Sequence, residues 1–312
     1  PGGNYLIVRG GLMNVWGRAV VEGGRYMAAM LLILVAPSVL AQPFERGVFW
    51  RIEKAGMPAS YVLGTIHAYD PRVAGVRPGV RRALQSVDVV ATELRMELEE
   101  MQQAMLAMFL PPDRNLSALL GKPDFDRLVA VLGTSGLPGE ALDRMKPFAA
   151  YTLLVMPPRA DVQPLDMAIY MEGKEAGKQM VGLETAEEQM RVLDRLGEGT
   201  MASELKSALR SLPILRAFID KMIALYGSEE LAGLYAISTQ PAPWPGSSAK
   251  LAQSIRDNLL DGRNQTMVDR ARAHLAKRSV LIAIGAAHLP GERGVLTLLA
   301  RDGYKVTRVS LD

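Results

Sequence analysis

One apolar run in the first half of the chain constrains the fold more than any other feature. Residues 87–94 read VDVVATEL, and apolar or β-branched residues occupy most positions rather than every second one. A strand that faces water on one side alternates apolar and polar residues, whereas a strand buried on both faces is apolar almost throughout. Residues 179–183 and 279–284 have the same character. The sequence therefore predicts the buried central strands of an α/β fold.

Three further strands and a set of helices complete this prediction. Residues 48–53 and 61–66 are rich in β-formers and flank a Gly-Met-Pro turn, so they predict a hairpin. A last short strand is expected at 305–309. Helices are expected at 97–109, 124–132, 138–156, 164–177, 186–235, 249–277 (interrupted at Asp261-Gly262) and 292–301. We expect a mixed central sheet flanked by helices, with large helical insertions before and after the fourth main strand.

The predicted helix at 97–109 lies in a stretch that is unusually rich in methionine. Four methionines occur between Met96 and Met108. Methionine fills irregular gaps in protein cores, but it also forms pliable binding surfaces. Packing into the core is the favoured interpretation here, and a substrate groove is the alternative.

The N-terminal segment predicts export. Residues 27–41 form an apolar run that is short for a membrane span and ends in Val39-Leu40-Ala41, which is typical of a signal peptide cleavage site. A buried helix is the alternative interpretation. We expect 1–26 to be an upstream extension, 27–41 a signal peptide, and 42–312 a single domain of a periplasmic or secreted protein without a stable membrane span.

Composition excludes several classes of function. The net charge of the 312 residues is +3, and it falls to +1 without residues 1–41, which hold three arginines and one glutamate. Binding to nucleic acid requires neutralisation of phosphates, so nucleic acid is not an expected partner. The sequence has no cysteine, which excludes disulfides, thiolate metal ligands and a cysteine nucleophile within it. No HExxH, GxSxG, P-loop or GxGxxG motif occurs either.

Two of the three histidines share one local context. His67 ends the segment GTIH after the second predicted strand, and His288 ends GAAH after the fifth. Functional sites of α/β sheets assemble at strand ends, and imidazole serves there as a metal ligand or a proton carrier. Either histidine alone is equally typical of a hydrogen-bonded residue at a strand end. The repeated motif is what favours a shared site. The third, His274, lies in a basic helix and is expected to face solvent.

Two glutamates occupy comparable positions and extend the candidate site. Glu93 lies at the end of VDVVATEL, and Glu184 follows the fourth predicted strand directly before the helix cap Thr185-x-x-Glu188. Two imidazoles with one or two carboxylates suit a divalent metal with an open position for water, and a free carboxylate could act as general base. Pairing of Glu93 with Arg95, and a favourable helix-dipole position for Glu184, are the structural alternatives.

Five segments, which together span nearly all of residues 42–312, carry a family resemblance: YVLGTIHAYDP (61–71), VDVVATEL (87–94), LDMAIYMEGKEAGKQMVGLETAEEQM (165–190), GRNQTMVDR (262–270) and IAIGAAHLPGERGVLTLLARDGYKVTRV (282–309). In these segments and in their order, the sequence resembles the TraB/GumN family, which includes the TIKI-type proteins. Where members often continue GTIH with small apolar residues and prolines, this chain has Ala68-Tyr69-Asp70-Pro71. That departure leaves the number of acidic site residues open.

The resemblance implies a metal-dependent peptidase. By carry-over, His67, Glu93 and His288 would hold a divalent Mn, Co or Zn ion, and Glu184 would be a further ligand or a general base. Arg263 and Asn264 match the family's Arg-Asn pair and would orient a peptide or small-molecule substrate. Two other functions stay open: a non-catalytic protein that binds a peptide, a pheromone-like signal or haem, and a metal-free hydrolase resembling erythromycin esterases, with histidine as general base.

Overall fold

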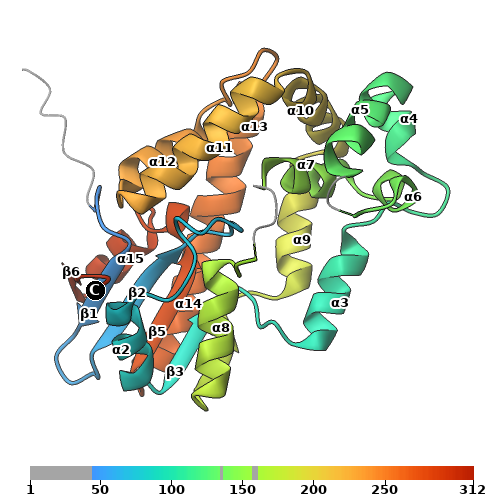
Figure 1. Ribbon diagram of the computed structural model, residues 1–312. Coiled ribbons are helices and arrows are strands. Elements are labelled where there is room, and N and C mark those ends of the chain that lie inside the picture. Colours follow the sequence, from blue (N-terminus) through green and yellow to red (C-terminus); the bar gives the residue numbers. More distant parts are fainter. Residues whose placement is uncertain (1–43, 134–135, 157–160) are drawn as a thin grey trace, which may run out of the picture. The chain divides into compact units, whose positions relative to one another are not determined.

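A computed structural model of the chain describes residues 44–133, 136–156 and 161–312, in which six strands form one sheet (Figure 1). The strand order is β4-β3-β5-β2-β1-β6. The strand bounds are β1 Phe49–Glu53, β2 Ser60–Thr65, β3 Val89–Thr92, β4 Gln179–Gly182, β5 Val280–Gly285 and β6 Lys305–Arg308. Each lies within one residue or two of a predicted strand. The extension and signal peptide predicted for 1–26 and 27–41 lie outside the described residues.

The sheet is mixed, as predicted. Strands β4, β3, β5 and β2 run parallel to one another, while β1 is antiparallel to both β2 and β6. The β1–β2 hairpin has the register Phe49↔Leu63 and Ile52↔Ser60, which confirms the hairpin prediction. The run at 87–94 forms a central strand because Val89, Val90 and Ala91 are fully buried. These observations confirm the α/β fold class.

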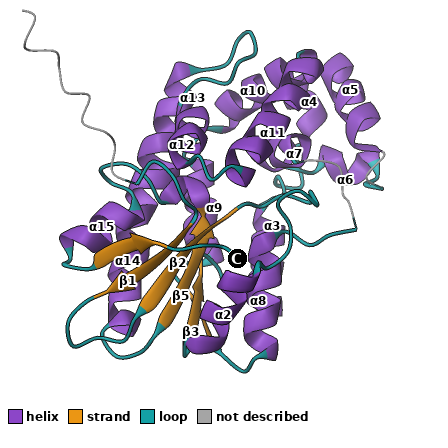
Figure 2. Ribbon diagram, turned by 60° about the vertical axis from the view of Figure 1, so that its left-hand side comes forward, coloured by secondary structure: helices purple, strands orange, loops and turns teal. Residues whose placement is uncertain are grey.

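Helices cover both faces of this sheet (Figure 2). Helices α2 (Pro78–Ser86) and α8 (Leu165–Glu175) lie on one face, and α14 (Gly262–Leu275) and α15 (Val295–Arg301) lie on the other. Contacts of α8 with β3, β4 and β5, and of α14 with β5, form the two interfaces. The central strands β3 and β5 are therefore almost completely buried, whereas the edge strand β4 stays partly exposed.

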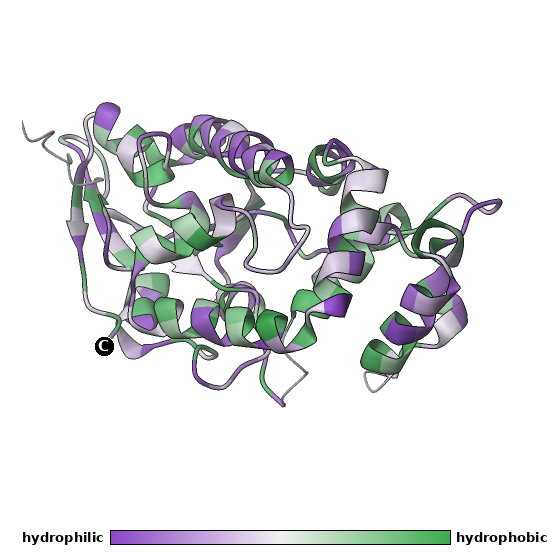
Figure 3. Ribbon diagram, turned by 90° about the horizontal axis from the view of Figure 1, so that it is seen from above, coloured by the Kyte–Doolittle hydropathy of each residue, from purple (hydrophilic) through white to green (hydrophobic). Residues whose placement is uncertain are grey.

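The two predicted helical insertions are present. Between β3 and β4 lie α3 (Leu98–Ala107), α4 (Leu116–Leu120), α5 (Lys122–Leu132), α6 (Gly139–Asp143), α7 (Pro147–Val155) and α8. Between β4 and β5 lie α9 (Ala186–Asp194), α10 (Glu198–Arg210), α11 (Leu212–Gly227), α12 (Leu231–Thr239), α13 (Ala249–Ser254), η2 (Ile255–Asp261) and α14. These helices carry both hydrophobic and hydrophilic stretches (Figure 3), as expected for elements that pack on one side and meet water on the other.

Four local predictions were wrong. Residues 179–183, expected to form a buried central strand, form the edge strand β4, in which Gln179 is exposed and the other residues are half-buried, because β4 pairs with β3 on one side alone. The single helix expected at 138–156 is two helices, because Lys146 precedes Pro147 and adopts the extended backbone that a following proline favours. The break expected at Asp261-Gly262 is absent, since η2 is a π-helix that runs directly into α14. The methionine-rich helix α3 does not pack into the core. None of its residues is buried, and Leu98 and Met105 are 73% and 60% exposed.

Candidate active site

The candidate residues follow the carboxyl ends of three adjacent parallel strands. Strand β5 lies between β2 and β3, and Thr65 pairs with Gly285 at the end of the β2–β5 ladder. His67 follows β2 by two residues, Glu93 follows β3 directly, and His288 ends the short 3₁₀ turn η3 (Ala286–His288) after β5. Because carboxyl ends of parallel strands share one edge of a sheet, this topology places all three side chains in one region.

Arg263 joins the two glutamates. Its Nε atom lies 3.0 and 2.9 Å from the two carboxylate oxygens of Glu184, and its Nη2 atom donates to Glu184 and Glu93, at 2.6 Å in each case. The third donor, Nη1, contacts the carbonyl oxygen of Leu259 at 3.2 Å. The Arg263 side chain is 12% exposed and that of Glu184 only 3%. The guanidinium is therefore held on three sides by protein acceptors and braces both carboxylates.

Glu93 is kept ionised by its surroundings. Besides Arg263, it accepts a 2.8 Å hydrogen bond at Oε1 from the backbone N–H of Gly285 and a 3.2 Å bond at Oε2 from Gln189. Burial alone would raise the pKa of Glu93. The Arg263 guanidinium, the positive charge that His288 carries once it is protonated at low pH, and the Gly285 N–H together lower that pKa to about 2. Glu93 does not pair with Arg95, which binds Glu100 instead.

The hydrogen bonds around His288 determine its tautomer. The amide nitrogen of Asn264 donates to the carbonyl oxygen of Arg293 at 2.9 Å, so the amide oxygen faces His288. That oxygen lies 2.6 Å from Nδ1 of His288, which must therefore be the donor. Nε2 stays unprotonated and lies 4.0 Å from Oε1 of Glu93. Burial lowers the pKa of His288 to about 4, so the ring is neutral at pH 7.

His67 is held by an aspartate that the sequence analysis did not single out. Its Nδ1 atom lies 2.8 Å from Oδ2 of Asp166, at the start of α8. This hydrogen bond is the main cause that raises the pKa of His67, and the charge of Glu93 adds to it. The electrostatic influence of Glu93 therefore reaches both imidazoles. The other oxygen of Asp166, Oδ1, is buried and has no hydrogen-bond partner among the described residues.

The two GxxH glycines serve different purposes. A Cβ atom on Gly64 would lie 2.8 Å from the Leu289 side chain and 3.0 Å from the Ala286 backbone, so this glycine lets η3 pack closely on β2. A Cβ atom on Gly285 would lie 3.2 Å from Oε1 of Glu93 and 3.5 Å from the His288 ring. The second glycine therefore leaves room for the site itself.

Five of the six predicted site residues thus form one network of direct contacts. Arg263 binds Glu93 and Glu184, and Glu93 lies beside His288. His288 in turn binds Asn264, which follows Arg263 on α14. His67 lies at the neighbouring strand end with Asp166. Asp166 and Gln189 were missed because residue patterns give no signal for them, although both lie in the segment 165–190 that carries the family resemblance.

The donor chemistry of the site fits a divalent metal. Metal-bound histidines usually donate their other ring N–H to a carboxylate or carbonyl, and both imidazoles have such a partner at Nδ1. Glu93 supplies a charged oxygen near Nε2 of His288. In the part of the chain that the structure describes, however, no three histidine, aspartate or glutamate side chains are already grouped closely enough to hold a metal.

The comparison with family models decides the family. The model described as the TraB/PrgY/gumN family matches residues 48–308, which include every strand of the sheet and every candidate residue. The chain belongs to the TraB/PrgY/gumN family. The resemblance seen in its sequence motifs is thereby confirmed.

The curated relatives that the chain matches are distant in sequence. The chain is 26% identical over 319 aligned positions to the protein named metalloprotease TIKI2 of Danio rerio, and 25% identical over 321 to a metalloprotease TIKI homolog of Amphimedon queenslandica. Each alignment covers 86% of this chain and 62% of the relative, so the chain spans under two thirds of their length. No solved structure matches the chain.

Across residues 44–133, 136–156 and 161–312, no helix has both the length and the apolar character that crossing a membrane requires.

Proposed function

We propose that this protein is a metal-dependent hydrolase that cleaves peptide bonds. The observation that carries the proposal is the matched environment of the two histidines. Each donates from Nδ1 to an oxygen acceptor, Asp166 or Asn264, and each thereby leaves Nε2 available as a ligand atom. The names of the TIKI relatives, which describe metalloproteases, support the same class of chemistry.

In this proposal His67, His288 and Glu93 hold a Mn, Co or Zn ion. A bound ion of this kind polarises a substrate carbonyl and lowers the pKa of a bound water. Asn264 fixes the orientation and tautomer of His288. Arg263 and Glu184 form a buried ion pair that holds Glu93 in place, and both act as positioning residues. Each guanidinium nitrogen of Arg263 already donates to a protein acceptor, which favours the positioning of Glu93 and Glu184 as the role of Arg263.

Metal analysis of purified, tag-free protein tests this proposal first. We expect about one equivalent of divalent metal, lost in His67→Ala, His288→Ala and Glu93→Gln, with peptide hydrolysis lost in parallel. His274→Ala is the matched control, because His274 lies on α14 outside the contact network. Chelation should abolish hydrolysis of a peptide library, and added Mn, Co or Zn should restore it. Hydrolysis that survives both chelation and loss of either site histidine would refute the metal mechanism.

The His67–Asp166 pair supports a second candidate. A histidine oriented by a carboxylate is the arrangement of a general base, so the site could act as a metal-free hydrolase. In that case chelator would have no effect on turnover, whereas Asp166→Asn and His67→Ala would lower it together.

We also propose that the protein acts outside the cytoplasm on a peptide or small-molecule substrate. The apolar run 27–41 with its small-x-small end motivates export. N-terminal sequencing of protein recovered from periplasm or medium should begin near Gln42. Recovery of the uncleaved chain from the cytoplasm alone would contradict export.

A further inference from the structure

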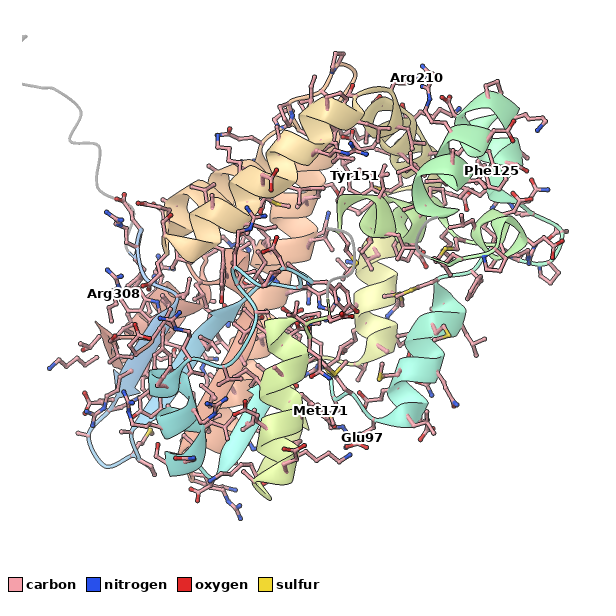
Figure 4. All side chains as sticks on the ribbon, in the orientation of Figure 1. Glu97, Phe125, Tyr151, Met171, Arg210 and Arg308 are labelled. Atoms are coloured by element: carbon pink, nitrogen blue, oxygen red, sulfur yellow. The ribbon has the colours of Figure 1, made fainter. Side chains whose placement is uncertain are left out.

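A cavity in the helical part of the molecule has no role in the site described above. It has a volume of about 250 Å³ and lies among α7, α10, α11, α12, α13 and η2, with α9 at its edge. Its walls are largely apolar and include Phe148, Tyr151, Phe218, Met201 and Met222. Tyr151 is labelled in Figure 4 amid these helices.

The polar groups in the cavity wall are mostly satisfied by the protein. Glu204 is 2% exposed and accepts hydrogen bonds from Trp244 Nε1 at 2.8 Å and from the Ser248 backbone N–H at 3.3 Å. Thr152 donates to the carbonyl of Phe148, and Ser238 donates to that of Leu234. These groups therefore need no polar ligand, and what the cavity presents to an occupant is apolar surface.

The size and lining of the cavity match one ring-sized apolar group. An apolar cavity of roughly 150 Å³ is enough to bind benzene, so 250 Å³ accommodates a phenyl or a branched aliphatic side chain. Aromatic and methionine side chains in the wall contact rings favourably and adapt to their shape. Phe218 in turn packs edge to face against Trp244, with 5.6 Å between the ring centroids.

Two elements connect this cavity to the candidate active site. On α9, Gln189 donates to both Glu93 and Glu184, and Leu193, one helical turn further, lines the cavity. On η2, Leu259 lines the cavity while its carbonyl oxygen accepts from Arg263. Single π-helical turns are frequent at functional sites, and this one lies between the cavity and the site.

We infer that the cavity is a specificity pocket for one aromatic or branched aliphatic side chain of the peptide substrate. This inference rests on the proposed peptidase function. An occupant here would lie one helical turn from the residues that hold Glu93 and Glu184. Binding of the side chain would thus fix the position of the peptide relative to the site.

Toluene binding tests the cavity without requiring any catalysis. Toluene should bind the metal-depleted protein in calorimetry and raise its melting temperature. Ala252→Leu and Thr152→Leu fill the cavity from two different walls and should weaken that binding at least about tenfold. Ala300→Leu, on the exposed side of α15, is the matched control and should leave it unchanged. Equal toluene affinity in the wild type and both filled variants would overturn the inference, as would no binding at all.

A competition experiment identifies the kind of side chain that occupies the cavity. N-acetylphenylalaninamide should displace toluene from the metal-depleted protein, and N-acetylglycinamide should not. Failure of the phenylalanine amide to displace toluene would overturn the side-chain assignment, whether or not the protein hydrolyses peptides. Displacement of toluene together with no hydrolysis of any peptide would support the side-chain pocket and contradict the proposed peptidase function. In an active enzyme, Ala252→Leu should lower the kcat/KM ratio of phenylalanine to glycine peptides at least about tenfold.

Discussion

Oδ1 of Asn264 lies 2.6 Å from Nδ1 of His288, and both residues are almost completely buried. The second hydrogen bond of Asn264, to the carbonyl of Arg293, prevents the amide from turning over. Asn264 therefore controls which nitrogen of His288 carries the proton. The residue after Arg263 in the family's Arg-Asn pair thus has a physical role that is distinct from substrate contact.

Asn264→Ala should weaken metal binding while the fold persists. Removal of the amide leaves Nδ1 of His288 without its acceptor, and loss of such a partner typically costs about 10–100-fold in metal affinity. Metal titration of the variant measures this directly, and circular dichroism reports on folding. Asn258→Ala is the control, because the Asn258 side chain donates to Ser254, the last residue of α13, one turn before it. Equal metal affinity in both variants would remove the positioning role.

Arg263→Gln should be strongly destabilising. The change leaves the buried carboxylate of Glu184 and the partly buried one of Glu93 without their cation, and breaking a buried ion pair in this way costs about 3–5 kcal/mol. Urea denaturation provides the free energy of unfolding. Arg272→Gln is the comparison, since Arg272 pairs with Asp302 at the surface and its loss should cost below about 1 kcal/mol. Similar losses in the two variants would contradict the bracing role.

The ion pair between Glu188 and Arg270 predicts part of the loss of folding stability at low pH. Hydrogen bonds from Arg270, chiefly, and from the Thr185 backbone lower the pKa of Glu188 to about 2 in the folded state. Because the folded pKa lies below the unfolded value of 4.5, this stabilisation is fully present above pH 4.5 and is lost as the pH falls towards 2. Glu188→Gln should therefore flatten the stability curve in that window. Identical pH profiles for variant and wild type would show that the pair contributes nothing.

The sequence predicted the sheet more reliably than the details of the helices. Strands such as 87–94 are recognisable because burial on both faces makes them apolar throughout. The capping box at Thr185 was equally readable, because it depends on residues three positions apart. The exposure of α3 was not readable, since the same methionines suit a core or a surface. Only the packing of neighbouring helices decides between the two.

The sequence predicted only part of the candidate site. His67, Glu93, Glu184 and His288 were identified because each follows a strand, and strand ends converge in a parallel sheet. Contacts between distant segments, such as His67 with Asp166 or Arg263 with Glu184, depend on where helices cross the sheet. The two pairs are separated by 99 and 79 positions in the sequence, and no local sequence pattern predicts a contact across such a separation.

The two GxxH glycines should separate function from stability. The backbone of Gly285 has φ −51° and ψ 133°, which any residue can adopt, so substitution there acts through its side chain. Gly285→Ala should press lightly on Glu93 and His288, and Gly285→Val should displace them. A shift of roughly 1 Å at a reacting group can cost about 10²-fold in rate. We expect Gly285→Val to lose metal affinity and turnover with little change in unfolding free energy.

Gly64→Ala should instead lower the unfolding free energy and leave metal affinity unchanged, because its Cβ atom would meet the Leu289 side chain and the Ala286 backbone rather than the site. Urea denaturation beside metal titration distinguishes the two, with Gly199→Ala as the neutral control, since a Cβ atom there meets nothing within 4 Å. A Gly285→Val protein with wild-type metal affinity would show that the site tolerates this side chain.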